Sequence, residues 1–573
     1  MNSSRVLKIA LLIAIVILVS NAVAISRDYQ DSWILEGLEI PFLLCVVTYV
    51  LAFFSEERVP LMVALAVVAR CVFLAIPNLK YVWFQGTAID QQTQYALADY
   101  VYKQGFIATQ GPFGVLVYGS TPLIQLSLAM FSIVLNVPVV DSMKYLPVLL
   151  SPIYPLGTYV IVKNLKFSNS QSIMKYALFI SSIPISIENY IVTGSQFGVL
   201  LAFFALTGLS MLVRRNDRRY LLVFVLSVFG LAVAHSPSSF LLTIFLLTAL
   251  AIQRIPLSQM MSSLRVPVIL AVTSICTTWL MFPARYTFET IVRLGFLRVQ
   301  GEGAESVPPR FLELARVNML GAFNTLLATD GAEIFLLLLA STGLIILLRT
   351  WKHLEKTSRS FLVVGATVFL FIPLGGLLSI GVFRIVFFAS TLFPIFASIL
   401  FVEYEGKRAM RLRKVVLPSI VLLILLSAAL GLYGCQPLIP SASILLKDLP
   451  VDQPLGYVTS VNSIYQRQMI EFAQNNVAGQ IACDSVTGDQ ITGLTDLNFS
   501  ANHLTYYYPL DKKQPAKDYS YFLIHVPGIA GPFSNSAETR TRDMILTVIN
   551  NSSNIYTNGE SYILLNQTMV AQP

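Results

Sequence analysis

Charged residues are scarce in this chain. Asp, Glu, Lys and Arg make up only 12% of its 573 residues, whereas hydrophobic residues make up 55%. A soluble domain carries about 25% charged residues, and a disordered chain is polar and charged. Both classes are therefore excluded. The mean hydropathy of +0.69 instead indicates a polytopic membrane protein built from helical spans.

Residues that commonly bind metals are also few. The chain has four histidines and five scattered cysteines, without a Cys-x-x-Cys pair. A histidine-rich metal cluster is therefore excluded. Neither heptads nor tandem repeats occur along the chain.

Charge of the two signs is unevenly distributed. The first 434 residues carry 32 basic and 20 acidic residues, and residues 435–573 carry seven basic and eleven acidic ones. A basic membrane part with an acidic tail is typical of positively charged cytoplasmic loops followed by a solvated domain. It does not suggest a nucleic-acid partner.

Fourteen apolar stretches are candidates for membrane spans, which need about 20 mostly apolar residues. The first resembles a signal sequence, but no convincing cleavage site follows it, so we interpret it as a retained anchor. The stretches are 6–25, 40–54, 60–76, 118–137, 143–162, 173–192, 196–213, 220–235, 237–252, 266–283, 331–349, 360–378, 384–402 and 415–434.

The charges of the loops predict the orientation of these spans. Every second connection is rich in Lys or Arg, and by the positive-inside rule these connections are cytoplasmic. Loops 77–117 and 284–330 and everything after residue 434 are then outside. This alternation of inside and outside loops holds only if one of the apolar stretches does not cross the membrane. We expect 118–137, which Gly and Pro residues interrupt, to be that re-entrant or juxtamembrane piece.

Residues 435–573 differ in character from the rest. Short apolar runs alternate with clusters of Gly, Pro, Asn and Asp around a helix-like stretch near 463–477, which predicts a small α/β domain. Four Asn-x-Ser/Thr sequons agree with a place outside the cell. The apolar runs are 457–461, 521–526 and 561–565.

The predicted fold class is mostly α. The chain is expected to be a polytopic helical membrane protein of about 13 spans plus the re-entrant piece. Residues 1–434 would form the transmembrane domain, with its outer loops at 77–117 and 284–330. Residues 435–573 would form an extracytoplasmic α/β domain.

The first outer loop contains an acid at the start of a helix-like stretch. Asp90 precedes residues 91–103, in which Tyr95, Ala98 and Tyr102 share one face, so the segment could lie flat on the bilayer with these three residues at the headgroups. Asp90 is either an N-cap favoured by the helix dipole or a catalytic carboxylate that faces a cavity.

Three further polar residues stand at outer positions. Asp99 is a second acid in the helix-like stretch. Glu188, four residues after Pro184, ends an apolar span, where an acid is costly unless it is solvated or paired. It is either a site residue or an interface residue that reaches water. His235, at the tip between two spans, is either a site residue or a structural turn residue.

Arginines dominate the basic residues of the outer face. All five basic residues in loop 284–330, beginning with Arg285, are arginines. Arginine is suited to bidentate phosphate contacts. They either bind phosphate or pair with the glutamates of the loop and with lipid headgroups. Arg384 stands at the outer mouth of an uncharged span, where an unpaired charge costs a few kcal/mol. It should therefore meet a carboxylate or a phosphate.

Outward acids and arginines beside an apolar wall suit a substrate with a lipid tail and a phosphate head. This pattern resembles the GT-C class of membrane glycosyltransferases. The resemblance rests on residues 86–105, in which a Gly precedes Asp90 and an amphipathic helix ends before another Gly. It also rests on the Pro-containing entry to the membrane at 118–123, on the second acid Glu188, and on Arg384 at the start of a late span.

The resemblance implies a function and a set of roles. GT-C enzymes use polyprenyl-phosphate sugars, which are dolichyl phosphates in archaea and eukaryotes, and His235-Ser236 resembles a turn of archaeal members. Whether a divalent cation, Mg²⁺ or Mn²⁺, takes part is left open, with Asp90 and Glu188 as its ligands if it does. The implied roles are catalytic base for Asp90, second acid for Glu188, phosphate binding for Arg384 and Arg285, and substrate binding for His235, Tyr95 and Asp99.

Three functions follow as hypotheses. The leading one is a glycosyltransferase of an archaeal plasma membrane, embedded in the lipid bilayer, that moves a sugar from a polyprenyl-phosphate donor to a protein, a lipid-linked glycan or a surface polymer. The alternative is a lipid-glycan transporter or flippase, although such proteins place charged sites near the midplane of the bilayer. The third is a membrane-anchored binding protein in which the tail is the functional part.

Overall fold

The structure is a computed structural model of the whole chain. It describes residues 58–80, 89–106, 121–165, 170–285 and 331–427, with gaps inside the last two ranges, together with Phe472 and four strands after residue 480. The predicted spans at 6–25 and 40–54 and the predicted strand at 457–461 lie outside the described residues.

The chain divides into two compact units. The first comprises residues 1–82, 143–303 and 328–432, and the second comprises residues 83–142, 304–327 and 433–573. The predicted division at residue 434 into a transmembrane and an extracytoplasmic domain stays a prediction.

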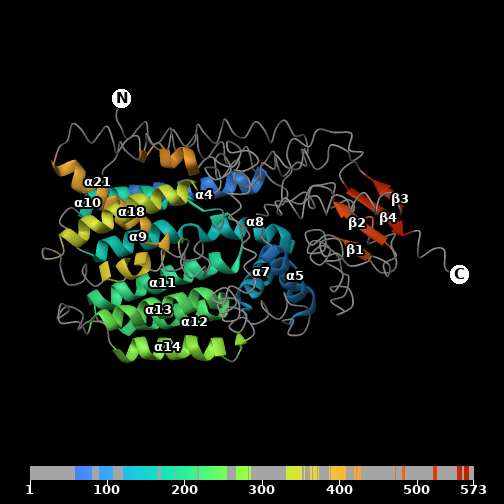
Figure 1. Cartoon of the computed structure of the whole chain (residues 1–573), viewed down its shortest axis with the longest axis horizontal. Helices are drawn as coiled ribbons and strands as arrows, with labels where there is room; N and C mark the ends of the chain where they lie inside the picture. Colours follow the sequence, from blue (N-terminus) through green and yellow to red (C-terminus); the bar gives the residue numbers. More distant parts are fainter. Residues whose placement is uncertain are drawn as a thin grey trace, which may run out of the picture. The chain divides into compact units, whose positions relative to one another are not determined.

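The described part of the first unit is helical. Its helices are rich in Leu, Ala, Val and Phe, and they satisfy their backbone groups internally, as a membrane requires. Figure 1 shows these helices running side by side. They are α4 (Val59–Lys80), α9 (Ile153–Asn164), α10 (Ser170–Ser181), α11 (Gly194–Arg215), α12 (Arg218–Ala234), α13 (Ser236–Gln253), α14 (Val266–Met281), α18 (Gly331–Arg349) and α21 (Phe393–Lys407).

Three stretches of helix in the described residues are long and apolar enough to cross a membrane. They are 141–164, which joins α8 (Val139–Leu150) to α9, the Gly194–Leu212 part of α11, and α18. Shorter apolar helices coincide with the predicted spans at 60–76, 220–235 and 237–252. The protein is therefore a mostly helical membrane protein, as predicted. The number of spans stays a prediction.

One predicted span ends much earlier than expected. The apolar stretch 173–192 was predicted to be one helix, but α10 has only 12 residues and ends at Ser181. Its length of about 18 Å is well short of the hydrocarbon core of about 30 Å. Residues 182–193, named the α10–α11 connection below, follow it, and those of them that the structure describes are not α-helical.

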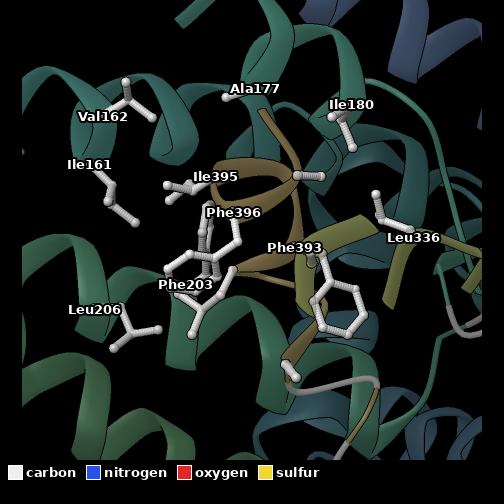
Figure 2. Packing of buried hydrophobic residues seen from close by; sticks show 14 of the residues in the cluster. Ile161, Val162, Ala177, Ile180, Phe203, Leu206, Leu336, Phe393, Ile395 and Phe396 are labelled. Atoms are coloured by element: carbon white, nitrogen blue, oxygen red, sulfur yellow. The ribbon is translucent and has the colours of Figure 1, made fainter. Parts of the chain in front are cut away.

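The core of the first unit is built from aromatic and branched side chains. Figure 2 shows Phe203 of α11 close to Phe396 of α21, among Ile161 of α9 and Leu206 of α11. All four side chains are buried. α18 packs against α21, and its Gly343 faces the backbone of Phe396 so closely that any Cβ there would overlap the Phe396 carbonyl.

The second unit contains the short helix pair α5 (Ile89–Gln104) and α7 (Leu123–Leu135), which pack against each other. α7 ends where Asn136 adopts a left-handed backbone with φ of 52°, a common helix stop. Its 13 residues span about 20 Å. That length is compatible with the prediction that the piece at 118–137 does not cross the membrane. The apolar side chains of Met130 and Val134 are exposed on one face of α7.

The predicted orientation of the first-loop helix is wrong in one respect. Tyr95, Ala98 and Tyr102 were expected to lie together at the headgroups. Ala98 is fully buried, whereas Tyr102 is 41% exposed. The buried face is instead formed by Gln94, Leu97, Ala98 and Val101, because α5 turns this face toward protein.

The C-terminal part contains a four-stranded mixed sheet with the order β1-β2-β4-β3. β1 pairs with β2 in parallel, and β4 pairs antiparallel with both β2 and β3. The predicted strands at 521–526 and 561–565 are confirmed, whereas β1 and β3 were not foreseen. The strands are β1 (Ile481–Cys483), β2 (Tyr521–His525), β3 (Ser552–Thr557) and β4 (Ser561–Asn566).

Candidate functional site

α5 carries three of the predicted site residues. Asp90 is its second residue and so belongs to the first turn, where the helix dipole favours a negative charge. Tyr95 is half-buried. Asp99 pairs with Lys103 one turn later, at 3.0 Å, and both side chains are partly exposed. This exposed pair is worth little stability, and it occupies the carboxylate that was predicted to bind substrate.

A buried amide pair holds α5 against α7. Gln125 Nε2 donates to Gln94 Oε1 at 2.7 Å, and both side chains are almost fully buried. Because Gln94 lies one turn after Asp90, this bond fixes the part of α5 that follows the predicted base. The pair is thus a rigid support for the first-loop motif.

We expect Gln125→Leu to loosen this helix pair. The substitution leaves Gln94 Oε1 buried without its donor, at a cost of about 1–3 kcal/mol. Hydrogen exchange of peptides from 89–104 should therefore become faster, and the double variant with Gln94→Leu should recover part of the protection. Ser127→Ala is the control, because Ser127 donates within its own helix, to the Leu123 carbonyl. Equal exchange in Gln125→Leu and the control would contradict the prediction.

The α10–α11 connection forms a second polar region, in the first unit. Its backbone leaves the helix while still inside the apolar part of the unit, so its polar groups need protein partners. The Asn189 side chain accepts from the Ile185 N–H at 3.2 Å. Gln196 Nε2 donates to the Asn189 carbonyl at 3.2 Å, and Thr193 Oγ1 accepts from the Gln196 N–H at 3.2 Å. These bonds tie the end of the connection to the first turn of α11.

Arg70 of α4 supports the other end of the connection. Its Nη1 donates to the Ser181 carbonyl at 2.8 Å and to the Ile183 carbonyl at 3.2 Å. Its guanidinium carbon lies 4.0 Å from the centre of the Tyr154 ring, a favourable cation–π geometry. Sequence reasoning missed Arg70. The signal that could have found it is a single arginine inside the apolar run 60–76.

His235 belongs to the same region. Its Nδ1 lies 2.7 Å from Ser238 Oγ, which fixes the ring at the corner between α12 and α13. Gly194 and Gly198 at the start of α11 face this corner, where added Cβ atoms would lie 2.9 Å from His235 Cδ2 and 2.7 Å from Ser238 Oγ. The two glycines therefore allow the histidine corner to pack against the end of the α10–α11 connection.

The remaining predicted residues are only partly described. Arg285 lies four residues after the end of α14 and is exposed. Glu188 and Arg384 lie outside the described residues, as do the Asp90 side chain and the other arginines of loop 284–330. Within the part of the chain that the structure describes, no three His, Cys, Asp or Glu side chains cluster as metal ligands would. The described residues therefore do not fit a metal centre by themselves.

Solved structures provide the comparison for the fold. No protein-family model and no curated protein matches the chain. The archaeal oligosaccharyltransferase AglB from Archaeoglobus fulgidus, in complex with an inhibitory peptide and a dolichol-phosphate, matches with a TM-score of 0.51 and 12% identity over 89% of this chain and 74% of that one. The apo form of the Archaeoglobus fulgidus oligosaccharyltransferase matches with a TM-score of 0.50 and 12% identity, over 90% of this chain and 75% of that one.

The chain has the GT-C fold. The predicted resemblance to this class is therefore confirmed at the level of the fold. ArnT from Cupriavidus metallidurans, bound to undecaprenyl phosphate, also matches, with a TM-score of 0.48 and 11% identity over 90% of this chain and 99% of that one. The GT-C fold was expected from the motif at 86–105 together with residues 118–123, Glu188 and Arg384, whereas the similarity to the solved structures extends over about 90% of the chain.

Proposed function

We propose that this protein is a glycosyltransferase that takes a sugar from a polyprenyl-phosphate donor at the outer face of the membrane. The observation that carries the proposal is the GT-C fold shared with AglB, a protein captured with a dolichol-phosphate. The acid and arginine pattern of the outer segments supports it independently, because it suits a substrate with a lipid tail and a phosphate head. The acceptor would be a protein, a lipid-linked glycan or a surface polymer.

The reaction would be a displacement at the anomeric carbon of the donor sugar. An acceptor hydroxyl oxygen forms the new bond to this carbon, and the bond from the carbon to the phosphate oxygen breaks. Asp90 would take the proton of the hydroxyl as general base. The electron pair of the broken bond leaves with the lipid phosphate, whose charge Arg384 and Arg285 would stabilise.

The other predicted residues would orient the substrates. Glu188 would be the second acid, and His235 and Tyr95 would contact acceptor or donor. Asp99 would contact a substrate only after its ion pair with Lys103 breaks. It is therefore the least favoured of the proposed substrate-binding residues. If a divalent cation takes part, Asp90 and Glu188 offer it the carboxylate oxygens that Mg²⁺ and Mn²⁺ favour.

Transfer from a panel of radiolabelled polyprenyl-phosphate sugars tests the proposal. The purified full-length chain should release lipid phosphate with at least one donor in the presence of acceptor lipid or peptide. Parallel reactions with Mg²⁺, with Mn²⁺ and with EDTA measure the need for a cation. Donor binding without any turnover would contradict the proposal and would favour a lipid-glycan flippase.

Arg384→Ala is expected to weaken binding of the donor lipid. A charge-assisted hydrogen bond contributes about 1.5–3 kcal/mol, so the donor Kd should rise by about 10- to 150-fold. The donor Kd of Arg384→Lys should lie between those of wild type and Arg384→Ala, since lysine keeps the charge but not the bidentate geometry. Titration with a fluorescent polyprenyl phosphate measures the Kd. An unchanged Kd in Arg384→Ala would remove this residue from the donor site.

A further inference from the structure

Arg70 is a buried charge in the middle of an apolar helix. It is the twelfth of the 22 residues of α4, and only 2% of its surface is exposed. A charged side chain at such a place is costly unless its environment compensates the charge. The contacts of Arg70 therefore indicate which part of the structure this buried charge stabilises.

Those partners are main-chain carbonyls and an aromatic ring, not a carboxylate. No acid in the described part of the chain forms an ion pair with Arg70. The two carbonyls, of Ser181 and Ile183, stand at the carboxyl end of α10, where the helix dipole is negative and carbonyls lack partners in the helix. The Tyr154 ring covers the guanidinium. Arg70 thus acts as a side-chain cap supplied from another helix, 111 residues away in sequence.

The capped end is the start of the α10–α11 connection. After Ile183 the chain passes Pro184, and Glu188 stands directly before Asn189, whose carbonyl is held by Gln196. The described residues on each side of Glu188 in the sequence are therefore held, Ser181 and Ile183 by Arg70 and Asn189 by Gln196. Only four residues separate Ile183 from Glu188 in the sequence, so we expect a shift at the cap to reach the acid.

We propose that Arg70 is a positioning residue for the glycosyl transfer, which holds the α10–α11 connection and with it Glu188. The inference rests on the proposed function for the role of Glu188, and on the described contacts alone for the role of the cap. The planar guanidinium suits this task because one nitrogen serves two carbonyls while the flat face stacks on Tyr154.

The test compares exchange and turnover in the full-length chain in lipid nanodiscs. The variants are Arg70→Lys, Arg70→Met and Tyr154→Leu, which removes the ring but keeps the guanidinium. The control is Asn164→Leu, because Asn164 is a buried polar residue at the opposite end of α9 from Tyr154, where it donates to Ser210. The readouts are hydrogen exchange of peptides from 182–193, kcat, and the donor KM.

The expected result separates this role from general destabilisation. Arg70→Met should raise the exchange rate of the Ile185 and Asn189 amides about 10-fold or more, as expected for local opening. Its kcat should fall by about 100-fold, the scale of a misplaced catalytic group, with a donor KM within about threefold of wild type. Tyr154→Leu and Arg70→Lys should give smaller changes in the same direction, and Asn164→Leu should give none.

The outcomes that overturn the proposal do not require Arg70→Met to fold. Exchange in 182–193 that matches wild type in both Tyr154→Leu and Arg70→Lys would refute the cap. Equal losses of kcat in Asn164→Leu would reduce Arg70 to an ordinary structural residue and would also overturn the proposal. If wild type shows no transfer with any donor, the proposed function fails, and the exchange arm still decides whether Arg70 holds the connection.

Discussion

Asp90→Asn is expected to lose about 10³-fold of the transfer rate, because general-base catalysis contributes about 10²- to 10⁴-fold and the amide cannot accept the proton of the acceptor hydroxyl. Asparagine has nearly the same shape and is also a good residue at a helix start. α5 should therefore form as in wild type. The donor Kd should stay within about threefold, since the loss is confined to a group that acts in the transition state.

The matched control is Asp141→Asn. Asp141 is also an acid in the first turn of a helix, α8, so both variants lose the same favourable interaction with a helix dipole, about 0.3–1 kcal/mol. Release of lipid phosphate from a radiolabelled donor measures the rate in both. Full activity in Asp90→Asn would exclude Asp90 as the base. An equal loss in Asp141→Asn would attribute the effect to the helix rather than to the carboxylate.

Gly343→Ala is expected to destabilise the first unit severely. Gly343 of α18 faces the main chain of α21, and an added Cβ would overlap the carbonyl oxygen of Phe396. A backbone atom cannot rotate away as a side chain can, so the two helices must separate. Overpacking costs about 1–3 kcal/mol and occasionally more. We expect the upper end of this range for alanine, and no folded protein for Gly343→Leu.

Gly208→Ala provides the comparison for this effect. Gly208 is also a helical glycine, in α11, but its added Cβ would lie 3.2 Å from the nearest atom, the Phe224 nitrogen. The gain in helix propensity, about 0.5–1 kcal/mol, should nearly offset so small a displacement. Thermal unfolding in detergent, followed by loss of the monodisperse peak, ranks the variants. A Gly343→Ala protein as stable as Gly208→Ala would show that α18 and α21 do not approach so closely.

Membrane class and most helix positions were predictable from the sequence because hydropathy is a local property. The runs at 196–213 and 331–349 became α11 and α18 within a few residues. The run at 173–192 was misinterpreted for the same reason. A buried, hydrogen-bonded connection can be as apolar in composition as a span, so hydropathy alone does not distinguish them. Only the partners of its backbone groups do.

The candidate site was predictable in part. Asp90 was selected as an acid at the start of a helix-like stretch in a predicted outer loop, and His235 as a polar residue at the tip between two predicted spans. Arg70 was missed, since its two carbonyl partners come from the end of α10 and from the α10–α11 connection, and its aromatic ring comes from α9. The face of α5 was also misjudged, because Ala98 is as compatible with a lipid headgroup as with the buried interface it forms.

The sequence by itself determined that this chain enters a membrane as helices and that the segments predicted to lie outside hold acids and arginines. Both follow from transfer free energies and charge, which act residue by residue. The tertiary structure decided that α10 stops short and that Arg70 caps its end, since main-chain carbonyls of distant segments have no signature in sequence. It likewise decided that α18 and α21 meet at Gly343, because close packing of two helices depends on which faces come together.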